Sequence, residues 1–279
     1  MKPFIVAEGI RKKYHPQSER ELRVDSFEIR PGDFILIKGS NGAGKTTFLN
    51  ILAGLDRPDA GSVKYYIDEE AVDIANLPDD EVVKVRRYHI TFIPQRISII
   101  PELSVLDNVI MPLLPLPIEE EALIREARKR LNIVGLGSKA DESAGNLSGG
   151  QAQKLMIARA LMKLSLFDMP EKAFLKPIKR PRFIVIFADE PFANIDDNDR
   201  PTLLDAIAKF VRRSTTAKRV AIIMASHASE RIERRANRVI RMEGGKIISR
   251  FLMLTPGDSN ELRRSSKARS RARLLLPYC

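Results

Sequence analysis

The stretch FILIKGSNGAGKTT, residues 34–47, decides the fold, because an apolar run leads into a glycine-rich turn and then into a helical pattern. It contains the spacing G-x-x-x-x-G-K-[ST] at Gly39, Gly44, Lys45 and Thr46. Glycines let the backbone turn tightly, so successive amides point inward at phosphates, while the lysine reaches phosphate oxygens and the hydroxyl suits Mg²⁺. The predicted phosphate-binding residues are Gly39, Ser40, Asn41, Gly42, Ala43, Gly44, Lys45, Thr46 and Thr47.

Outward from this loop, short β-branched runs alternate with helical patterns. Several runs, such as FIVIFADE at 183–190 and RVAIIMASH at 219–227, are apolar almost throughout, as expected of strands buried on both faces of a parallel sheet. We therefore predict an α/β fold with a parallel-rich central sheet and an antiparallel β part near the N-terminus.

A second group of polar residues follows the apolar strand at 183–188. Asp189 and Glu190 end that strand, in a chain that also contains the complete phosphate-loop spacing; a solvated strand end is the plainer alternative. In enzymes with such a loop, the first acid holds Mg²⁺, and the next can orient or deprotonate an attacking water. The pair therefore predicts a metal-assisted hydrolytic site.

The middle of the chain has helical signals and no clear strand from about residue 103 to 163. Ser104 precedes one predicted helix as a capping candidate, and IEEEALIREARKRLNIVGL at 118–136 is amphipathic. LSGGQ, comprising Leu147, Ser148, Gly149, Gly150 and Gln151, precedes a third. Free amides at a helix N-terminus favour an anion, so this end predicts a phosphate contact.

Composition sets the remaining limits. The chain has 279 residues and one cysteine, Cys279, which excludes an internal disulfide framework. Its longest apolar run, FIVIFA at 183–188, is far shorter than the ~20 residues of a membrane-spanning helix. Residues 165–182 are rich in proline and basic residues and predict a surface loop with at most one helical turn.

The order of these motifs resembles the ATPase subunit of ATP-binding cassette (ABC) proteins over about residues 4–249. The resemblance implies an ABC ATPase domain over 1–250, a helical subdomain over about 97–163, and a basic tail over 251–279. It implies ATP and Mg²⁺ as the bound species, with ATP hydrolysis that powers transport, whether export or lipoprotein release, or mechanotransmission. The largest departure is an apparent insertion at 165–182; Ala228 and Lys154 also stand where Asp and Arg are usual.

The resemblance also implies roles for single residues. Gln95 in FIPQ matches the glutamine that contacts Mg²⁺ and water, and His227 matches the histidine that contacts the γ-phosphate. Tyr14 matches the aromatic that stacks on adenine, and Asp196 in ANID matches a dimer-facing loop. Tyr14 and His227 have a plainer alternative as ordinary residues at a strand end, and Gln95 as a turn residue.

In this family two ATPase domains pack head to tail, and LSGGQ of one subunit binds the γ-phosphate held by the other. One signature and one phosphate loop in this chain therefore predict a homodimer with two sites. The resemblance also implies a separate transmembrane permease, so the chain would sit peripherally on the cytoplasmic face of the inner membrane.

Residues 86–114 resemble the lipoprotein-releasing, macrolide-efflux and cell-division ATPases, with Pro101, Asn108 and Pro112 in matching positions. An importer ATPase and a soluble ABC ATPase acting on nucleic acid or ribosomes remain alternatives, although nucleic acid is the less favoured partner. An inactive cassette acting as a dimerisation scaffold is a third. The tail, with six basic residues and no acid over 263–279, predicts a disordered terminus, a contact with anionic lipid or a contact with nucleic acid.

Overall fold

Strand β3 (Phe34–Lys38) lies inside a ten-stranded sheet, flanked by strands from the far end of the chain. The structure is a computed structural model that describes residues 2–13, 20–68, 70–212, 219–227 and 230–252. β3 pairs in parallel with β8 (Val220–Ala225) on one side and with β9 (Arg238–Glu243) on the other. β7 (Ile184–Asp189) and β6 (Ile90–Ile93) extend the parallel part beyond β8. This arrangement confirms the predicted parallel-rich sheet.

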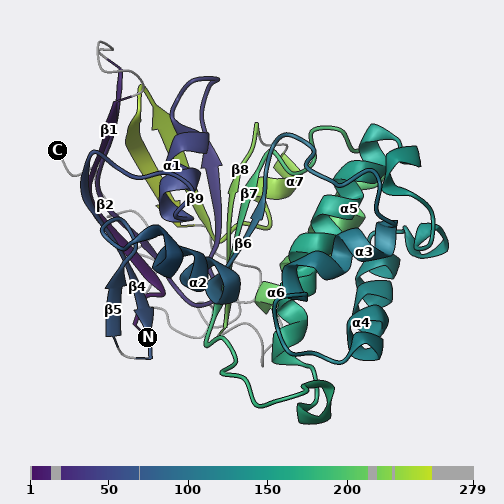
Figure 1. Cartoon of the computed structure of the whole chain (residues 1–279). Helices are drawn as coiled ribbons and strands as arrows, with labels where there is room; N and C mark the ends of the chain where they lie inside the picture. The colour runs from purple at the N-terminus through teal and green to yellow at the C-terminus, as the bar shows by residue number, and fades with distance from the viewer. Residues whose placement is uncertain (1, 14–19, 69, 213–218, 228–229, 253–279) are drawn as a thin grey trace, which may run out of the picture.

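The other half of the same sheet is mostly antiparallel and lies at the left of Figure 1. It consists of β1 (Ile5–Lys13), β2 (Glu21–Ile29), β4 (Ala60–Ile67) and β5 (Glu70–Asp73). β10 (Lys246–Leu252) joins the halves, because it is antiparallel to β9 and touches β2 at one position. The predicted antiparallel β part near the N-terminus is therefore present.

The alternation of side chains along β3 explains why the strand is apolar throughout. Ile35 and Ile37 point into one core, which they share with α1 (Lys45–Leu52) and the antiparallel strands. Phe34 and Leu36 point to the opposite face and pack in a second core with the helices of the middle segment. Burial of alternate residues on two faces is the pattern of a central strand covered on both sides.

Three helices of the middle segment stand together at the right of Figure 1, beyond the β6 end of the sheet. They are α3 (Val105–Ile110), α4 (Glu120–Ile133) and α5 (Gly149–Met162). Ser104 caps α3, since its side chain accepts a hydrogen bond from the amide of Asp107. The predicted helical segment and its first cap are both confirmed.

Helix α6 (Arg200–Arg212) lies between β7 and β8 in the chain, and α7 (Glu230–Glu233) follows β8. Four elements were not predicted: β4, β5, β10 and α2 (Asp79–His89). α2 lacks a long apolar stripe and buries only Val82, Val85 and His89. Its acidic first turn and basic last turn favour a helix through the dipole, a weaker signal than periodicity.

Residues 165–182 are largely irregular and exposed, as predicted for a surface loop, but part of the segment is buried. They contain the short helical turn Glu171–Ala173, and a second turn, Lys163–Phe167, runs into them. Leu166 and Met169 are buried, and Ala173 accepts a main-chain hydrogen bond from Glu119 at the start of α4. The apolar side chains spaced along this segment find a partner in α4, which proline content and charge could not show.

Lys163 lies where the end of α5 meets the end of α2. Its buried ammonium donates hydrogen bonds to the main-chain oxygens of Arg86 (2.8 Å) and Ile90. Burial, together with the nearby guanidinium groups of Arg86 and Arg87, lowers the pKa of Lys163 to about 7. The side chain thus satisfies carbonyls at a helix C-terminus at the cost of a buried charge.

Replacing Lys163 by methionine is expected to change how the stability depends on pH. Between about pH 7 and the unfolded pKa near 10.4, the unfolded chain holds a proton that the folded chain has released, so the free energy of unfolding rises with pH. Lys163→Met should remove a slope of up to about 1.4 kcal/mol per pH unit in that window. Urea denaturation of both proteins at several pH values gives the free energy of unfolding as a function of pH. The same slope against pH in both proteins would contradict the prediction.

Candidate functional site

The glycine-rich loop between β3 and α1 wraps around the side chain of Lys45. The Lys45 Nζ donates to the main-chain oxygens of Gly39 (2.8 Å) and Ser40 (3.1 Å), so the ammonium lies across the loop. Gly42 and Gly44 have positive φ angles of 75° and 96°, which side-chain-bearing residues rarely adopt. The sequence prediction of a tight loop is confirmed in its geometry.

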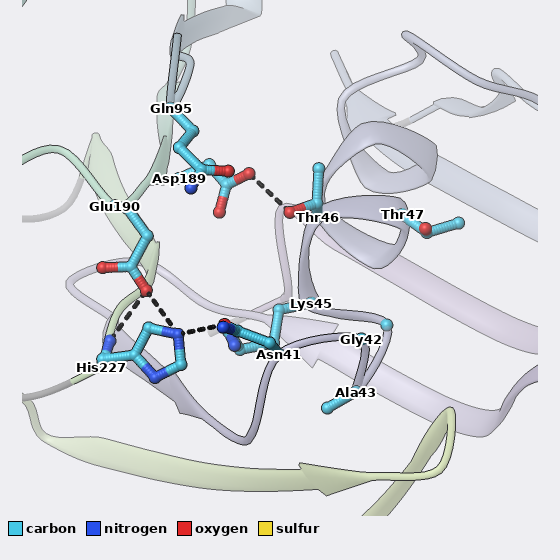
Figure 2. A pocket seen from close by; sticks show the side chains of 11 residues that line it. Asn41, Gly42, Ala43, Lys45, Thr46, Thr47, Gln95, Asp189, Glu190 and His227 are labelled. Atoms are coloured by element: carbon cyan, nitrogen blue, oxygen red, sulfur yellow. Dashed lines mark hydrogen bonds and ion pairs between the residues drawn. The ribbon is translucent and has the colours of Figure 1, made fainter. Parts of the chain in front are cut away.

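Asp189 stands at the carboxyl end of β7 and faces this loop (Figure 2). Its Oδ2 accepts a hydrogen bond of 2.6 Å from the Thr46 hydroxyl. Burial raises the pKa of Asp189, while the bond from Thr46 and the positive charge of Lys45 act in the opposite direction. The hydroxyl and the carboxylate that were predicted as Mg²⁺ ligands from distant parts of the sequence therefore lie in contact.

Glu190 follows Asp189 with a positive φ of 45°, one of two such non-glycine residues among those described. Its Oε1 accepts from the main-chain amide of His227 at 2.8 Å, and its Oε2 accepts from the Ser226 hydroxyl at 3.1 Å. An unusual backbone conformation held by surrounding contacts is common at functional sites. The carboxylate is therefore fixed in direction by the end of β8.

The His227 ring lies between Glu190 and the phosphate loop, as Figure 2 shows. Its Nε2 is 2.7 Å from Asn41 Oδ1 and 3.7 Å from Glu190 Oε1. Gln95 reaches the same space from the segment after β6.

These groups line one cavity of about 340 Å³. Its walls are Asn41, Gly42, Ala43, Gly44, Lys45, Thr46, Thr47, Gln95, Asp189, Glu190 and His227. Gly39 and Ser40 belong to the loop but accept from Lys45 rather than line the cavity. A space with backbone amides, one ammonium and several oxygen donors suits a polyphosphate with a hard cation.

The five signature residues, 147–151, do not line this cavity and lie at the start of α5. The Ser148 hydroxyl accepts from the Gln151 amide at 3.3 Å, and Gln151 Oε1 accepts from the Ser148 amide at 3.0 Å. This capping box leaves other first-turn amides of α5 without a helical partner. Asp196 is likewise absent from the cavity lining, and Tyr14 falls outside the described residues.

Ser226 was missed by the sequence analysis, although it binds Glu190 directly. Its position immediately before His227 was the available signal.

Among the described residues, no group of three or more His, Cys, Asp or Glu could hold a metal ion by itself. No helix in the described part of the chain is long and apolar enough to cross a membrane.

The cavity and the order of strands in the sheet are those expected of an ABC ATPase. A family model for the ABC transporter matches residues 22–168. The chain belongs to this family. It is 33% identical to the lipoprotein-releasing system ATP-binding protein LolD of Myxococcus xanthus, over 81% of this chain and 89% of that protein. It is 31% identical to the macrolide export ATP-binding/permease protein MacB of Bdellovibrio bacteriovorus, over 99% of this chain but only 39% of that protein.

Two further comparisons bear on activity. The phosphonates import ATP-binding protein PhnC of Bdellovibrio bacteriovorus is 30% identical, over 89% of this chain and 88% of its own. The ATP-binding cassette MJ0796, solved as a dimer in a post-hydrolysis state with ADP and Pi, matches with a TM-score of 0.74 and 27% identity. That match covers 90% of this chain and 99% of that one. The chain is accordingly an ATP-binding and ATP-hydrolysing subunit of a transporter.

Close backbone packing at Gly39 predicts a large effect of adding one methyl group. A Cβ at Gly39 would lie 2.4 Å from the Met242 main-chain oxygen, so Gly39→Ala must displace the loop or β9. We expect the melting temperature to fall by several degrees, corresponding to about 1–3 kcal/mol. Gly149→Ala is the matched control, because a Cβ there meets no atom within 4 Å. Equal melting temperatures for the two variants would contradict this packing.

Proposed function

We propose that this chain powers export, lipoprotein release or mechanotransmission through a separate transmembrane partner, with the cavity beside Lys45 as its ATP site. The observation that carries the proposal is the meeting of Lys45, Asp189, Glu190 and His227 in one cavity. In this proposal residues 1–250 form the ATPase domain, about 97–163 its helical subdomain, and 251–279 a basic tail.

The phosphate loop would bind the β- and γ-phosphates of ATP. Residues of the loop line the cavity, and the Lys45 ammonium lies across the loop, within reach of phosphate oxygens in the same space. Tyr14, outside the described residues, is proposed to stack on the adenine.

Mg²⁺ fits the oxygen donors present. The Thr46 hydroxyl and the Asp189 carboxylate are in contact, and Gln95 lies in the same cavity. These three would hold the ion directly or through water, together with phosphate oxygens. When bound, the ion would offset charge on the phosphates during hydrolysis.

Glu190 would accept the proton of the attacking water. The bonds from the His227 amide and the Ser226 hydroxyl hold its carboxylate, which leaves little freedom to turn away. His227 would contact the γ-phosphate, since its Nε2 lies between Glu190 and Asn41 of the phosphate loop. Gln95 would orient the water.

A head-to-tail homodimer would complete each site. Residues 147–151 lie apart from the cavity of their own chain, while their capping box keeps the first turn of α5 ordered for a phosphate. The signature would therefore bind the γ-phosphate of the second subunit, with Asp196 at the dimer contact.

A second cavity of about 340 Å³ supports a docking site for the transmembrane partner. It lies between the core and the helical segment. Its walls combine apolar side chains, such as Leu55, Val83, Phe92 and Met111, with the basic residues Arg86, Arg87 and Lys163. Leu55 and Val83 are 41% and 46% exposed, and Leu114, next to this groove in sequence, is 61% exposed. Apolar side chains gathered at one rim are characteristic of a protein interface.

The partner would place the chain on the cytoplasmic face of the inner membrane, with the basic tail as an additional contact to anionic lipid. The resemblance of residues 86–114 favours the lipoprotein-release or efflux branch. An importer remains the alternative within the family, and a soluble ATPase acting on nucleic acid or ribosomes the alternative outside it.

Glu190→Gln should bind ATP, dimerise and fail to turn over, because the amide cannot accept the proton of water. We expect the steady-state ATPase rate to fall by at least about 100-fold, with ATP-dependent dimers seen by light scattering. Lys45→Ala is the comparison, since it should lose ATP affinity and therefore the dimer as well. A Glu190→Gln protein that hydrolyses ATP at the wild-type rate would exclude Glu190 as the base.

A carboxylate placed among the exposed apolar residues of this second cavity should weaken the partner complex. Tagged Glu190→Gln protein is recovered with ATP and Mg²⁺ from detergent-solubilised source cells, and copurifying chains are identified by mass spectrometry. A permease with few spans and a large extracytoplasmic domain supports the proposed branch; a many-spanned permease indicates an importer, and ribosomal proteins or nucleic acid the soluble alternative. Val83→Glu should lower permease recovery about tenfold, whereas Ile248→Glu, at an exposed position on β10, should not.

A further inference from the structure

The start of α5 is bound to the chain segment that follows Glu190 in the same subunit. The Gln153 Nε2 donates to the main-chain oxygen of Pro191 at 3.0 Å, and both residues are buried. Within the signature itself, a Cβ on Gly150 would lie 2.8 Å from the main-chain oxygen of Asn194. The signature turn and the segment after the strand-end acids are therefore in direct contact.

A second side chain on the same helix reinforces this contact. The Lys154 Nζ lies 2.6 Å from Asp199 Oδ2, and the lysine side chain is only 19% exposed. Between these two bonds, the segment turns on its own main-chain hydrogen bonds, Ala193 to Glu190 and Ile195 to Phe192. Residues 190–199 are accordingly held at both ends by the first two turns of α5.

Glutamine at position 153 stabilises the folded state less than an apolar side chain of the same size would. It has no exposed surface, and its Oε1 is the only buried side-chain nitrogen or oxygen without a hydrogen-bond partner among the described residues. An unpaired buried amide oxygen destabilises the folded state, and an apolar side chain of similar shape would avoid that cost. A buried polar group that does not improve stability is the pattern expected of a residue retained for position.

We propose that Gln153 is a positioning residue for Glu190, which it reaches through the main chain of Pro191. The inference rests on the proposed function, in which the signature contacts the ATP of one site and Glu190 acts at the other. Gln153 then passes the seating of the signature on the second subunit's nucleotide to Glu190 of its own subunit. The backbone of Glu190, with its φ of 45°, is the point where a small shift of Pro191 would turn the carboxylate.

Gln153→Met tests the bond while keeping the side-chain volume. It removes the unpaired Oε1 and leaves the Pro191 oxygen without a donor, so one unpaired acceptor replaces another and the melting temperature should change by no more than about 2 °C. We expect kcat for ATP hydrolysis to fall about tenfold, with the dissociation constant for ATP unchanged and the Hill coefficient lowered. Tyr65→Phe is the matched control, because it removes a buried bond from the Tyr65 hydroxyl to the Leu52 main-chain oxygen, and Tyr65 lines neither cavity.

Mixed dimers separate positioning of Glu190 from damage to the signature. Two differently tagged chains are combined with the copurifying membrane partner, one of them carrying Glu190→Gln, so that a single site turns over. Gln153→Met in the chain with intact Glu190 should lower the rate about tenfold, and in the Glu190→Gln chain it should change it less than about twofold. Equal rates, or the larger loss when the substitution is in the Glu190→Gln chain, would overturn the inference. Absence of ATPase activity in the wild-type complex would instead remove the proposed function, before any Gln153 variant is compared.

Discussion

The parallel alignment of β3, β8, β7 and β6 is the constraint on which the rest of the molecule depends. Because these strands run in one direction, their carboxyl ends meet at one edge of the sheet. The phosphate loop follows β3, His227 follows β8, Asp189 and Glu190 end β7, and Gln95 follows β6. Four segments that are distant in sequence thus deliver one side chain or more to a single cavity, and no long loop is needed to bring them together.

Helix α5 gives this edge its second role, because it contacts two of the same segments and also the end of α2. Its side chains or main chain bind Thr91 of β6, Pro191 after β7, and, through Lys163 just beyond its end, the carbonyls at the end of α2. The helix begins at the signature and packs along its length against the segments that carry Gln95 and Glu190. A movement of its N-terminus therefore reaches both groups through short contacts rather than through a flexible linker.

Much of the fold was predictable because the deciding elements carry strong local signals. The glycine spacing defined the loop at 39–46, and the unbroken apolar runs at 184–188 and 220–225 identified strands covered on both faces. Strand β4 and helix α2 were missed because they are only partly buried and lack a clean period. The packing of residues 165–182 could not be read from the sequence either, since the bridge between Ile118 and Phe174 joins positions with no shared pattern.

The site shows the same division. Lys45, Asp189 and Glu190 were predictable because their chemistry needs a particular residue at a particular strand end. The contacts that orient them were not, because Ser226 and Gln153 act through geometry alone: a hydroxyl 3.1 Å from Glu190 Oε2 and an amide 3.0 Å from the Pro191 oxygen. Single-sequence patterns report which elements exist, and they contain little about the side chains that meet between elements.

The position of β3 also shapes how the chain reaches its native state. Both strands that flank it come from the last third of the described chain, and the amide of Phe34 bonds to Asn237, 203 residues away. At synthesis rates of about 5–20 residues per second, the central strand and its loop must wait roughly 10–40 s for their partners. During that interval β3 has no strand paired to either edge, and its apolar side chains are uncovered. A nascent chain in this condition aggregates or needs a chaperone.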